Sequence, residues 1–358
     1  MQVFVNGRFL TQPVTGVQRC AREFLSEWSK RAESGRVVAP TLLCPPDAPP
    51  SPFPAIPSVR VGSHRGHLWE QMDLARHTRG GLLVSLCNTG PIAHPRQIVT
   101  IHDASAFAVP NSYSFAFRSW YRMLHRGLGR SAALVLTDSA FSANELTRWL
   151  GIDRRKTRVV HLGSEHVLAV EPDPTVIQRL GLERGTYMLT VSSRSPHKNL
   201  AALAAATRQL ASDHVLVAAG GDNRRVFQSV ERLGRGVIET GYLSDGELRA
   251  LYEGAALFVY PSGYEGFGLP PVEAMACGCP VVVAHAASLP EVCGDAAEYC
   301  DGAAPTSIAE AMGRVLSDHA LRARLIEAGR RRAAHFTWSR AADGLLAAVE
   351  EASPPWAA

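Results

Sequence analysis

The sequence predicts an α/β fold with two doubly wound, Rossmann-like domains that face an inter-domain cleft. Its 358 residues exceed one ordinary domain and, at about 150 residues per domain, suggest two. From Tyr187 onward, apolar runs of strand length alternate regularly with stretches of helical period, and the first half repeats this alternation more loosely. Near-continuous apolar strands separated by helices are typical of buried parallel strands, which doubly wound sheets contain.

In the first half, the apolar runs predict five strands, near 2–5, 37–43, 82–86, 97–101 and 133–137. Helical periodicity predicts helices near 16–32, 113–130 and 140–150. Eight of the 23 prolines lie between Pro40 and Pro57, and such a run is expected to be a loop, because proline is excluded from helix interiors and inner strands. Two interpretations remain for this loop, a stiff surface excursion or a lid on the acceptor side.

In the second half, strands are expected at Tyr187–Ser192, Val215–Ala219, Leu257–Tyr260 and Val281–Ala284. Helices are expected at 199–211, 222–234, 245–254, 271–278 and 305–317. Proline and charged residues near 161–186 mark the boundary between the halves. We therefore expect a first domain at 1–165, a second domain at 166–336, and a terminal helix in 337–358 that packs back on the first domain.

Composition indicates a globular protein without a membrane anchor. The chain is 46% hydrophobic and 20% charged, and no window of ~18 residues is apolar without charge. The first residues, MQVFVNGRFL, lack a basic head followed by an apolar stretch, so no secretory signal is expected. The seven cysteines include Cys277, Cys279 and Cys293 in apolar or helical contexts, which fits reduced thiols. These features predict a cytoplasmic protein.

Charge is distributed unevenly along the chain. Residues 1–165 hold 20 Lys/Arg and 11 Asp/Glu, a net of +9, and residues 166–358 hold 17 and 22, a net of −5, which together give +4. Within 113–130, Phe117, Tyr121, Leu124 and Leu128 form one helical stripe, with Trp120 beside it, and Arg118, Arg122, Arg126 and Arg130 form a second. This helix is either a core helix with a solvated basic face or a surface for an anionic membrane. No nucleic-acid-binding motif accompanies the charge, so nucleic acid is not an expected partner.

Ligands of open α/β sheets bind beyond the carboxyl ends of the strands, so the residues that follow the apolar runs are candidates for a site. After 187–192 comes SSRSPHKN, in which Arg194 and Lys198 flank Pro196 and Asn199 opens a helix. Two cations beside a helix start make an anion site; alternatively, Asn199 caps the helix and the cations are solvated. Only three lysines occur in the chain and most of its other basic residues are arginines, so a lysine at position 198 is unusual here.

After 257–260 comes PSGYEGFGLPPVEA, which holds Glu265 in a glycine-rich loop and Glu273 in what we expect to be the first turn of a helix set up by Pro270 and Pro271. A carboxylate in the first turn gains ~0.3–1 kcal/mol from the helix dipole, which would explain Glu273 without a ligand. Glu265 has no such explanation. A carboxylate in a loop that faces a cleft suits the hydroxyl pairs of a sugar or a ribose.

In the first half, His102 and Asp103 follow the run 97–101, where that domain would face the cleft. A lone histidine at a strand end can equally be structural. Thr15 and Gly16 precede a helix and offer another contact for phosphate.

Together these residues resemble the retaining glycosyltransferases of family 4, which have the two-domain GT-B fold. The resemblance rests on the E-x7-E motif from Glu265 to Glu273, on RSPHKN with Arg194 and Lys198, on GYLSDGELRALYEGAALFVYPS (241–262), and on the looser TGVQR (15–19), TIHD (100–103) and TDSAFSANEL (137–146). One departure is Ser193, where relatives often have glycine before the arginine.

The resemblance implies that the first domain, 1–165, binds the acceptor and that the second domain, 166–336, binds the nucleotide sugar. It also implies roles for particular residues. Arg194 and Lys198 would hold the donor diphosphate, and Glu273 would bind the ribose. Glu265 would bind the transferred sugar, together with the backbone N–H groups of Gly266, Phe267, Gly268 and Leu269. His102 would lie near the reacting face of the sugar, Asp103 near the acceptor hydroxyl, and Gly16 near the phosphates.

The expected activity is transfer of a hexose from a GDP- or UDP-sugar, with GDP-mannose preferred, to a glycan or lipid-linked acceptor in surface polysaccharide synthesis. No cofactor is expected, and metal-independent transfer is predicted because cations occupy the place of a metal beside the diphosphate. Two alternatives remain, a sugar-nucleotide epimerase of GT-B fold and a nucleotide-sugar-binding module without turnover. Peripheral attachment to the inner face of a membrane is a further expectation.

Overall fold

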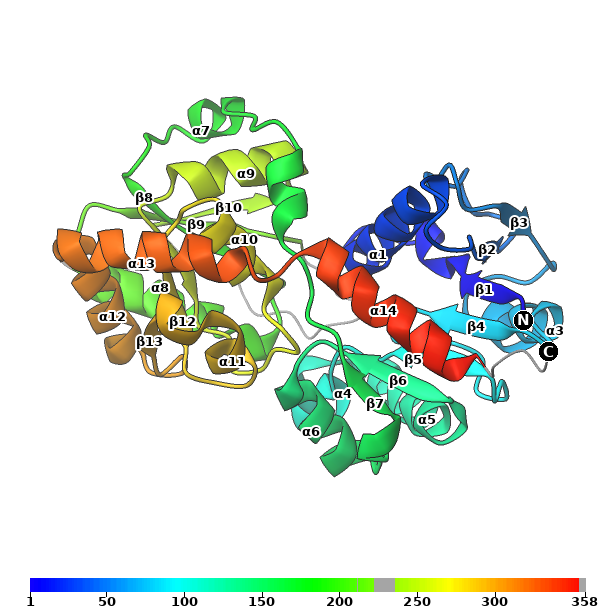
Figure 1. The fold of residues 1–358 in the computed structure, drawn as a ribbon. Helices are drawn as coiled ribbons and strands as arrows, with labels where there is room; N and C mark the ends of the chain where they lie inside the picture. The colour runs from blue at the N-terminus through cyan, green and yellow to red at the C-terminus, as the bar shows by residue number, and fades with distance from the viewer. Residues whose placement is uncertain (211, 222–235, 354–358) are drawn as a thin grey trace. The chain divides into compact units, whose positions relative to one another are not determined.

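A computed structural model of the chain describes residues 1–210, 212–221 and 236–353, so the helix expected at 222–234 lies outside the described residues. The chain divides into two compact units (Figure 1). Unit 1 comprises Met1–Ala104, Ser119–Leu162 and Trp338–Ala358, and unit 2 comprises Ser105–Arg118 and Gly163–Thr337. The predicted division differs from this one in the segment 105–118, which we expected in the first domain and which belongs to unit 2.

Unit 1 contains a seven-stranded parallel sheet in the order β3-β2-β1-β4-β5-β6-β7. Its strands are β1 (Val3–Asn6), β2 (Thr41–Cys44), β3 (Ser58–Arg60), β4 (Leu82–Ser85), β5 (Gln97–Thr100), β6 (Leu134–Thr137) and β7 (Thr157–Val159). The apolar runs correctly predicted the five central strands. They missed β3, whose residues are all exposed, and the three-residue β7, because neither contains a buried apolar run.

The proline-rich segment was wrongly assigned to a loop in its first part. Residues Thr41–Cys44 form β2, which lies between β1 and β3, because the prolines after Pro40 resume only at Pro45. Beyond that point the segment is irregular, and it packs on its own unit: Phe53 and Ile56 are buried, and the ring of Phe53 lies 6.4 Å from that of Phe9.

The helices of unit 1 include α1 (Gly16–Glu33), α6 (Ala140–Leu150) and α14 (Trp338–Ala352), with the shorter α2 (Gly66–Trp69), η2 (Glu70–Leu74) and α3 (Ala75–His77). Thr15 and Gln18 form a capping box that begins α1. Helix α14 packs on α1 (Figure 1), where Trp338 meets Phe24 edge to face at 5.8 Å and Asp343 pairs with Arg31 at 2.6 Å.

Unit 2 contains a six-stranded parallel sheet in the order β10-β9-β8-β11-β12-β13. Its strands are β8 (Tyr187–Val191), β9 (Val215–Ala219), β10 (Val237–Gly241), β11 (Leu257–Tyr260), β12 (Val281–Ala284) and β13 (Glu298–Cys300). The helices are α7 (Thr175–Arg179), α8 (Leu200–Gln209), α9 (Asp245–Gly254), α10 (Leu269–Ala276), α11 (Leu289–Cys293), α12 (Pro305–Ser317) and α13 (His319–Ala333). Leu203, Leu216, Val259 and Met312 join strands and helices in one buried core.

The segment 105–118 belongs to unit 2 because its polar and aromatic groups contact the loop after β8. It contains α4 (Ser105–Ala108), η3 (Pro110–Ser112) and the first residues of α5 (Phe115–Ser131). Ser112 Oγ lies 2.8 Å from His197 Nδ1, and the ring of Tyr113 lies 6.5 Å from that of His197. Such long-range contacts leave no periodic signal in the sequence.

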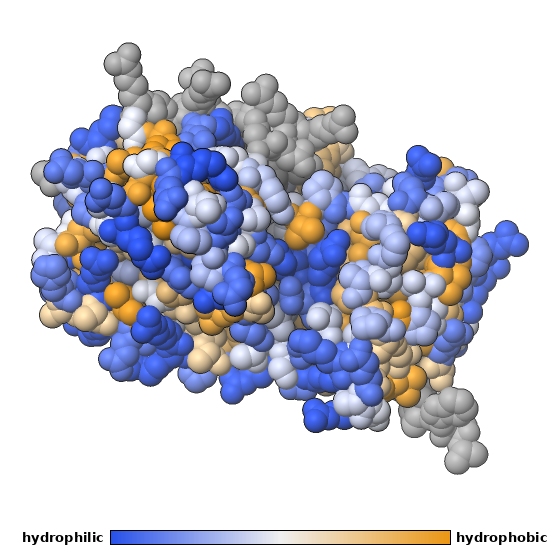
Figure 2. All heavy atoms as spheres, turned by 90° about the horizontal axis from the view of Figure 1, so that it is seen from above, coloured by the Kyte–Doolittle hydropathy of each residue, from blue (hydrophilic) through white to orange (hydrophobic). Residues whose placement is uncertain are grey.

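The apolar stripe of α5 is partly a core element: Leu124 and Leu128 are fully buried, whereas Phe117 and Tyr121 are half-buried. Throughout the described ranges, no helix combines the length and the apolar character needed to cross a bilayer. On the face drawn in Figure 2, hydrophobic residues gather in separate groups among hydrophilic ones.

Candidate functional site

The candidate donor site lies in unit 2, at the carboxyl ends of β8 and β11. These two neighbouring strands mark the topological switch point of the sheet, because the chain continues to β9 and β10 on one side and to β12 and β13 on the other. Ligands of doubly wound sheets bind in the crevice outside the carboxyl strand ends at such a point. The loops that leave β8 and β11 hold six of the predicted residues: Arg194, Lys198, Glu265, Gly266, Phe267 and Gly268.

Lys198 and Glu265 meet in this site. Lys198 Nζ lies 2.5 Å from Glu265 Oε1 and 3.2 Å from the hydroxyl of Tyr260, the last residue of β11. Burial alone would raise the pKa of the Glu265 carboxyl, but Lys198 and neighbouring hydrogen bonds outweigh it and lower that pKa, so the carboxylate is ionised. An ammonium has three N–H donors, and two of those of Lys198 are used here.

Arg194 forms an ion pair with Glu239 of β10, which is separate from the pair of Lys198 with Glu265. Its guanidinium is about one-quarter exposed, so it keeps contact with solvent. Sequence reasoning missed Glu239 because β10 has half-exposed residues and no continuous apolar run, so the strand that carries it was not predicted.

The loop between the two predicted glutamates ends in the start of α10. Gly268 has φ of +92°, and a Cβ there would lie 2.7 Å from Leu289 Cδ2, so this position requires glycine. Leu269 is the first residue of the helix and is buried. Phe267 is buried against Phe336 at 5.3 Å between ring centroids, which anchors the loop to its own unit.

Glu273 is placed differently from our expectation. Helix α10 begins at Leu269, so Glu273 lies in the second turn, and the helix has no acidic residue in its first turn. The dipole explanation for Glu273 is therefore wrong. The residue is 7% exposed, and its carboxylate lies 3.0 Å from His166 Nε2 and accepts a hydrogen bond from the Tyr252 hydroxyl at 2.9 Å. A ribose contact would add to these bonds or replace one of them.

Asn199 also departs from its expected role. It occupies the N-cap position of α8 in a left-handed conformation, but its side chain makes no capping bond. Instead, Asn199 Nδ2 donates to the carbonyl of Pro261 at 2.9 Å, and Gly263 N donates to that of His197 at 2.8 Å. These bonds join the loop that follows β8 to the loop that follows β11.

In unit 1, His102 is fixed by two acceptors. His102 Nδ1 lies 2.8 Å from Asp138 Oδ2, and Nε2 lies 3.2 Å from the carbonyl of Leu86. Burial alone would lower the pKa of His102, but the Asp138 carboxylate outweighs it and raises that pKa. Because both neighbours accept hydrogen bonds, the geometry favours the doubly protonated ring. His102 therefore keeps neither ring nitrogen for a reacting sugar in this arrangement.

The remaining predicted residues of unit 1 lie at strand and helix ends. Asp103 follows His102 beyond β5 and is half-buried. Gly16 is the exposed first residue of α1, and a Cβ built there would meet nothing within 4 Å. Within the ranges that the structure describes, no group of three or more His, Cys, Asp or Glu could hold a metal ion.

Comparisons with known proteins define the class. Residues 174–332 match the family model of the group 1 glycosyl transferases. The chain is 35% identical over 256 residues to O-antigen chain mannosyltransferase B of Escherichia coli, covering 68% of this chain and 67% of that relative. It is 32% identical over 247 residues to the MMP alpha-(1->4)-mannosyltransferase of Mycolicibacterium hassiacum, covering 66% of this chain and 58% of that one.

Solved structures of other proteins share the fold. Sucrose-phosphate synthase from Thermosynechococcus elongatus superposes with a TM-score of 0.76 at 20% identity, covering 99% of this chain and 100% of its own. HepE from Anabaena, solved with UDP and glucose, superposes with a TM-score of 0.73 at 17% identity, covering 98% and 100%. The predicted GT-B fold of two Rossmann-like domains is thereby confirmed. The chain belongs to the group 1 glycosyltransferases and is itself a glycosyltransferase, as the motif predicted.

Proposed function

We propose that this chain transfers a hexose, with mannose as the first candidate, from a nucleoside diphosphate sugar to a glycan or lipid-linked acceptor in polysaccharide synthesis. The mannosyltransferase relatives support the sugar, and the group 1 family supports the reaction. The observation that carries the proposal is the Lys198–Glu265 pair at the switch point of unit 2, because it sets a cation for the diphosphate beside a carboxylate for the sugar hydroxyls.

The donor's diphosphate gains negative charge when its bond to the sugar breaks. Arg194 would stabilise that charge in a preorganised site, together with the N–H of Lys198 that has no partner among the described residues. A contact of this kind contributes ~2.7–4 kcal/mol to the transition state. These cations take the place of a metal, so transfer is proposed to need none. As the bond between the anomeric carbon and the diphosphate oxygen breaks, the acceptor oxygen would bond that carbon on the same face, and the leaving phosphate oxygen would take the acceptor's proton. The anomeric configuration would therefore be retained.

Removal of Lys198 is expected to abolish most of the activity. We expect Lys198→Ala to lower kcat by ~10²–10³-fold, whereas Lys30→Ala, at an exposed lysine paired with Glu27, should leave it unchanged. The assay measures nucleoside diphosphate released from GDP-mannose or UDP-glucose with a mannose-terminated oligosaccharide, in buffer with EDTA.

Product analysis separates this proposal from its alternatives. Mass and NMR spectra of an elongated oligosaccharide with retained configuration would support transfer. Epimerised donor formed without acceptor would show an epimerase, and donor binding without turnover would show a binding module. Equal kcat for Lys198→Ala and Lys30→Ala would contradict the assignment of the site.

The proposal includes a peripheral contact with anionic membrane through α5. Its core-facing residues are buried, but Phe115 and Met123 are 75% and 52% exposed, and Arg126 and Arg130 are exposed on the same helix. Exposed apolar side chains beside arginines match the surface of an anionic bilayer. A lipid-linked acceptor would be found at such a surface.

A further inference from the structure

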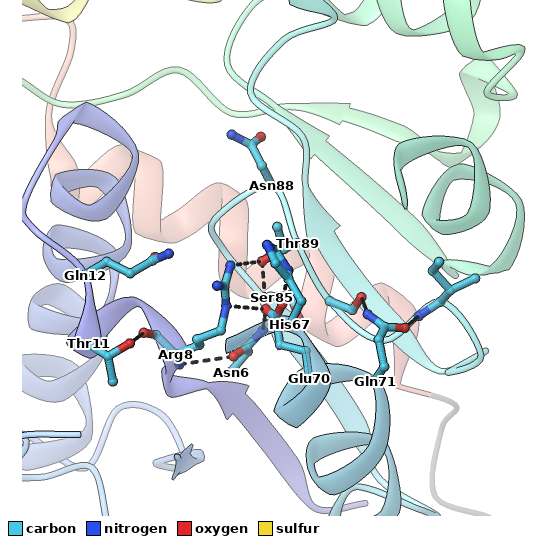
Figure 3. A network of polar contacts seen from close by, with 12 residues as sticks. Asn6, Arg8, Thr11, Gln12, His67, Glu70, Gln71, Ser85, Asn88 and Thr89 are labelled. Carbon is cyan, nitrogen blue, oxygen red and sulfur yellow. Dashed lines mark hydrogen bonds and ion pairs between the residues drawn. The ribbon is translucent and has the colours of Figure 1, made fainter. Parts of the chain in front are cut away.

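The carboxyl ends of β1 and β4 in unit 1 hold a buried polar group that the donor site does not use. We call it the Arg8 cluster, and it consists of Asn6, Arg8, Glu70, Ser85 and Thr89 (Figure 3). Glu70 Oε1 accepts from Asn6 Nδ2 at 2.8 Å and from the Thr89 hydroxyl at 2.7 Å, and it lies 3.0 Å from Arg8 Nε. Arg8 Nη2 donates to Thr89 Oγ1 at 3.0 Å.

The position of the cluster is that of a ligand site. Strands β1 and β4 are neighbours, and the chain continues from β1 to β2 and β3 on one side and from β4 to β5, β6 and β7 on the other. This is the topological switch point of the first sheet, where open α/β sheets bind ligands. The loop after β1 also leads to α1 through Gln12, which places a further amide at the same edge.

Burial of the Arg8–Glu70 ion pair costs desolvation free energy, and the two opposite charges leave the pair with no net charge. Arg8 is 7% exposed and Glu70 is fully buried. Burial alone would raise the pKa of Glu70, but His67, Arg8, Thr89 and Asn6 together lower it, so the carboxylate is ionised. Replacing a buried ion pair by apolar groups is often neutral or stabilising, so stability alone does not account for this one.

The cluster has unused hydrogen-bond donors. Arg8 Nη1 has no partner among the described residues. The side chain is more than nine-tenths buried, but this nitrogen keeps contact with solvent. Figure 3 shows the side chain of Gln12 pointing toward the guanidinium of Arg8, and Asn88 above Thr89 with its amide end directed away from the Arg8 cluster.

The amide orientations of Gln12 and Asn88 follow from their neighbours. Gln18 Oε1 accepts from Thr15, so Gln18 Nε2 is the donor that reaches Gln12 Oε1 at 3.0 Å, and Gln12 Nε2 must point away. Asn88 Oδ1 accepts the backbone N–H of His102 at 2.8 Å, so Asn88 Nδ2 is directed away from that bond. Neither NH₂ group has a partner in the described part of the chain.

We propose that Arg8, Gln12 and Asn88 form the acceptor subsite of this glycosyltransferase and that it binds the hydroxyl groups of an uncharged sugar. The subsite offers N–H donors from a cation already neutralised by Glu70 and from two neutral amides, which suits hydroxyl oxygens. The donor site sets two cations, Arg194 and Lys198, toward a diphosphate, whereas this subsite offers one cation and two neutral amides, which favours hydroxyl oxygens over a phosphate. This inference rests on the proposed transfer reaction.

Isosteric substitutions test the subsite without disturbing its frame. Gln12→Glu and Asn88→Asp each keep the oxygen that Gln18 or His102 bonds and replace the outward NH₂ by an oxygen. Asp also tolerates the left-handed conformation of Asn88, whose φ is +61°. Gln178→Glu, at an exposed position of α7, is the matched control for the added charge. Thermal unfolding of all three variants checks the fold.

The readouts are KM for a neutral mannose-terminated oligosaccharide, KM for GDP-mannose, and NMR titration of the oligosaccharide without donor. Each of the two subsite variants should raise the acceptor KM and weaken the titration by about 10-fold or more, with donor KM and the control unchanged. Unchanged acceptor KM and binding in both folded variants would overturn the subsite, as would preferential use of the 6-phosphorylated oligosaccharide. Oligosaccharide binding that depends on Gln12 and Asn88 but gives no transfer would support the subsite and contradict the proposed reaction.

Discussion

His102 shows how the partners of one residue determine its protonation. Its two ring nitrogens face the Asp138 carboxylate and the Leu86 carbonyl, and its pKa lies above the ordinary value of about 6.5 in spite of burial. A raised folded-state pKa gives a stability contribution that is complete below about pH 6.5 and is lost as the pH rises through the folded value. His125 acts in the opposite direction, since burial lowers its pKa to about 4 and its contribution is lost as the pH falls below about 6.5.

We therefore expect Asp138→Asn to lower the melting temperature most near pH 6.5, where the ring of His102 is charged and the ring of His125 is largely neutral. The difference from the wild type should shrink as the pH rises through the folded pKa of His102, because the neutral ring keeps a hydrogen bond to Asp138 but loses the charge attraction. Thermal unfolding measured from pH 6.5 to 9 tests this. A difference that grows as the pH rises would contradict a charge attraction between His102 and Asp138.

At the residue scale, the sequence predicted Lys198 and Glu265 as site residues, and the structure brings them together. Their partners could not be predicted, because Glu239, His166 and Tyr252 are distant in sequence from the residues they bond and belong to no recognisable motif. The subsite around Arg8 was likewise invisible, since a single arginine after a short strand carries no pattern. Motifs therefore identify side chains, and long-range pairing determines their electrostatics.

At the element scale, α5 combines a buried stripe with exposed apolar and basic side chains. We expect the protein to float with vesicles that contain anionic phospholipid and not with neutral ones. Replacing both Arg126 and Arg130 by glutamate should lower the bound fraction by at least ~10-fold, since each cation near an anionic surface contributes about 1 kcal/mol. The control is Arg324→Glu on the exposed part of α13. Equal flotation with both lipid types would remove the membrane contact from the proposal.

Long apolar runs made the central strands of both sheets predictable, because a strand buried on both faces has few polar residues. The edge strands β3 and β10 were missed, since their side chains are exposed or half-exposed. Helix boundaries were less predictable: Pro270 and Pro271 indicated the start of α10, but the helix already begins at Leu269, which moved Glu273 out of the first turn.

At the scale of the whole molecule, each unit places its unusual polar groups at the switch point of its own sheet. Unit 2 has paired cations and carboxylates there, and unit 1 has the Arg8 cluster beside the amides of Gln12 and Asn88. The repeated alternation of strands and helices predicted this architecture. The segment 105–118 was not predictable in the same way, because its membership in unit 2 depends on contacts such as that of Ser112 with His197.

The account depends on fixed protein cations that bind the donor's diphosphate. Titration calorimetry of GDP and UDP in buffer with EDTA tests this most directly, using the wild type, Lys198→Ala and Lys30→Ala. We predict that at least one nucleotide binds without a divalent ion and that Lys198→Ala, unlike Lys30→Ala, raises its Kd by about 10-fold or more, the effect of losing one charge-assisted bond. Binding that requires a divalent ion, or an equal Kd in both variants, would contradict it.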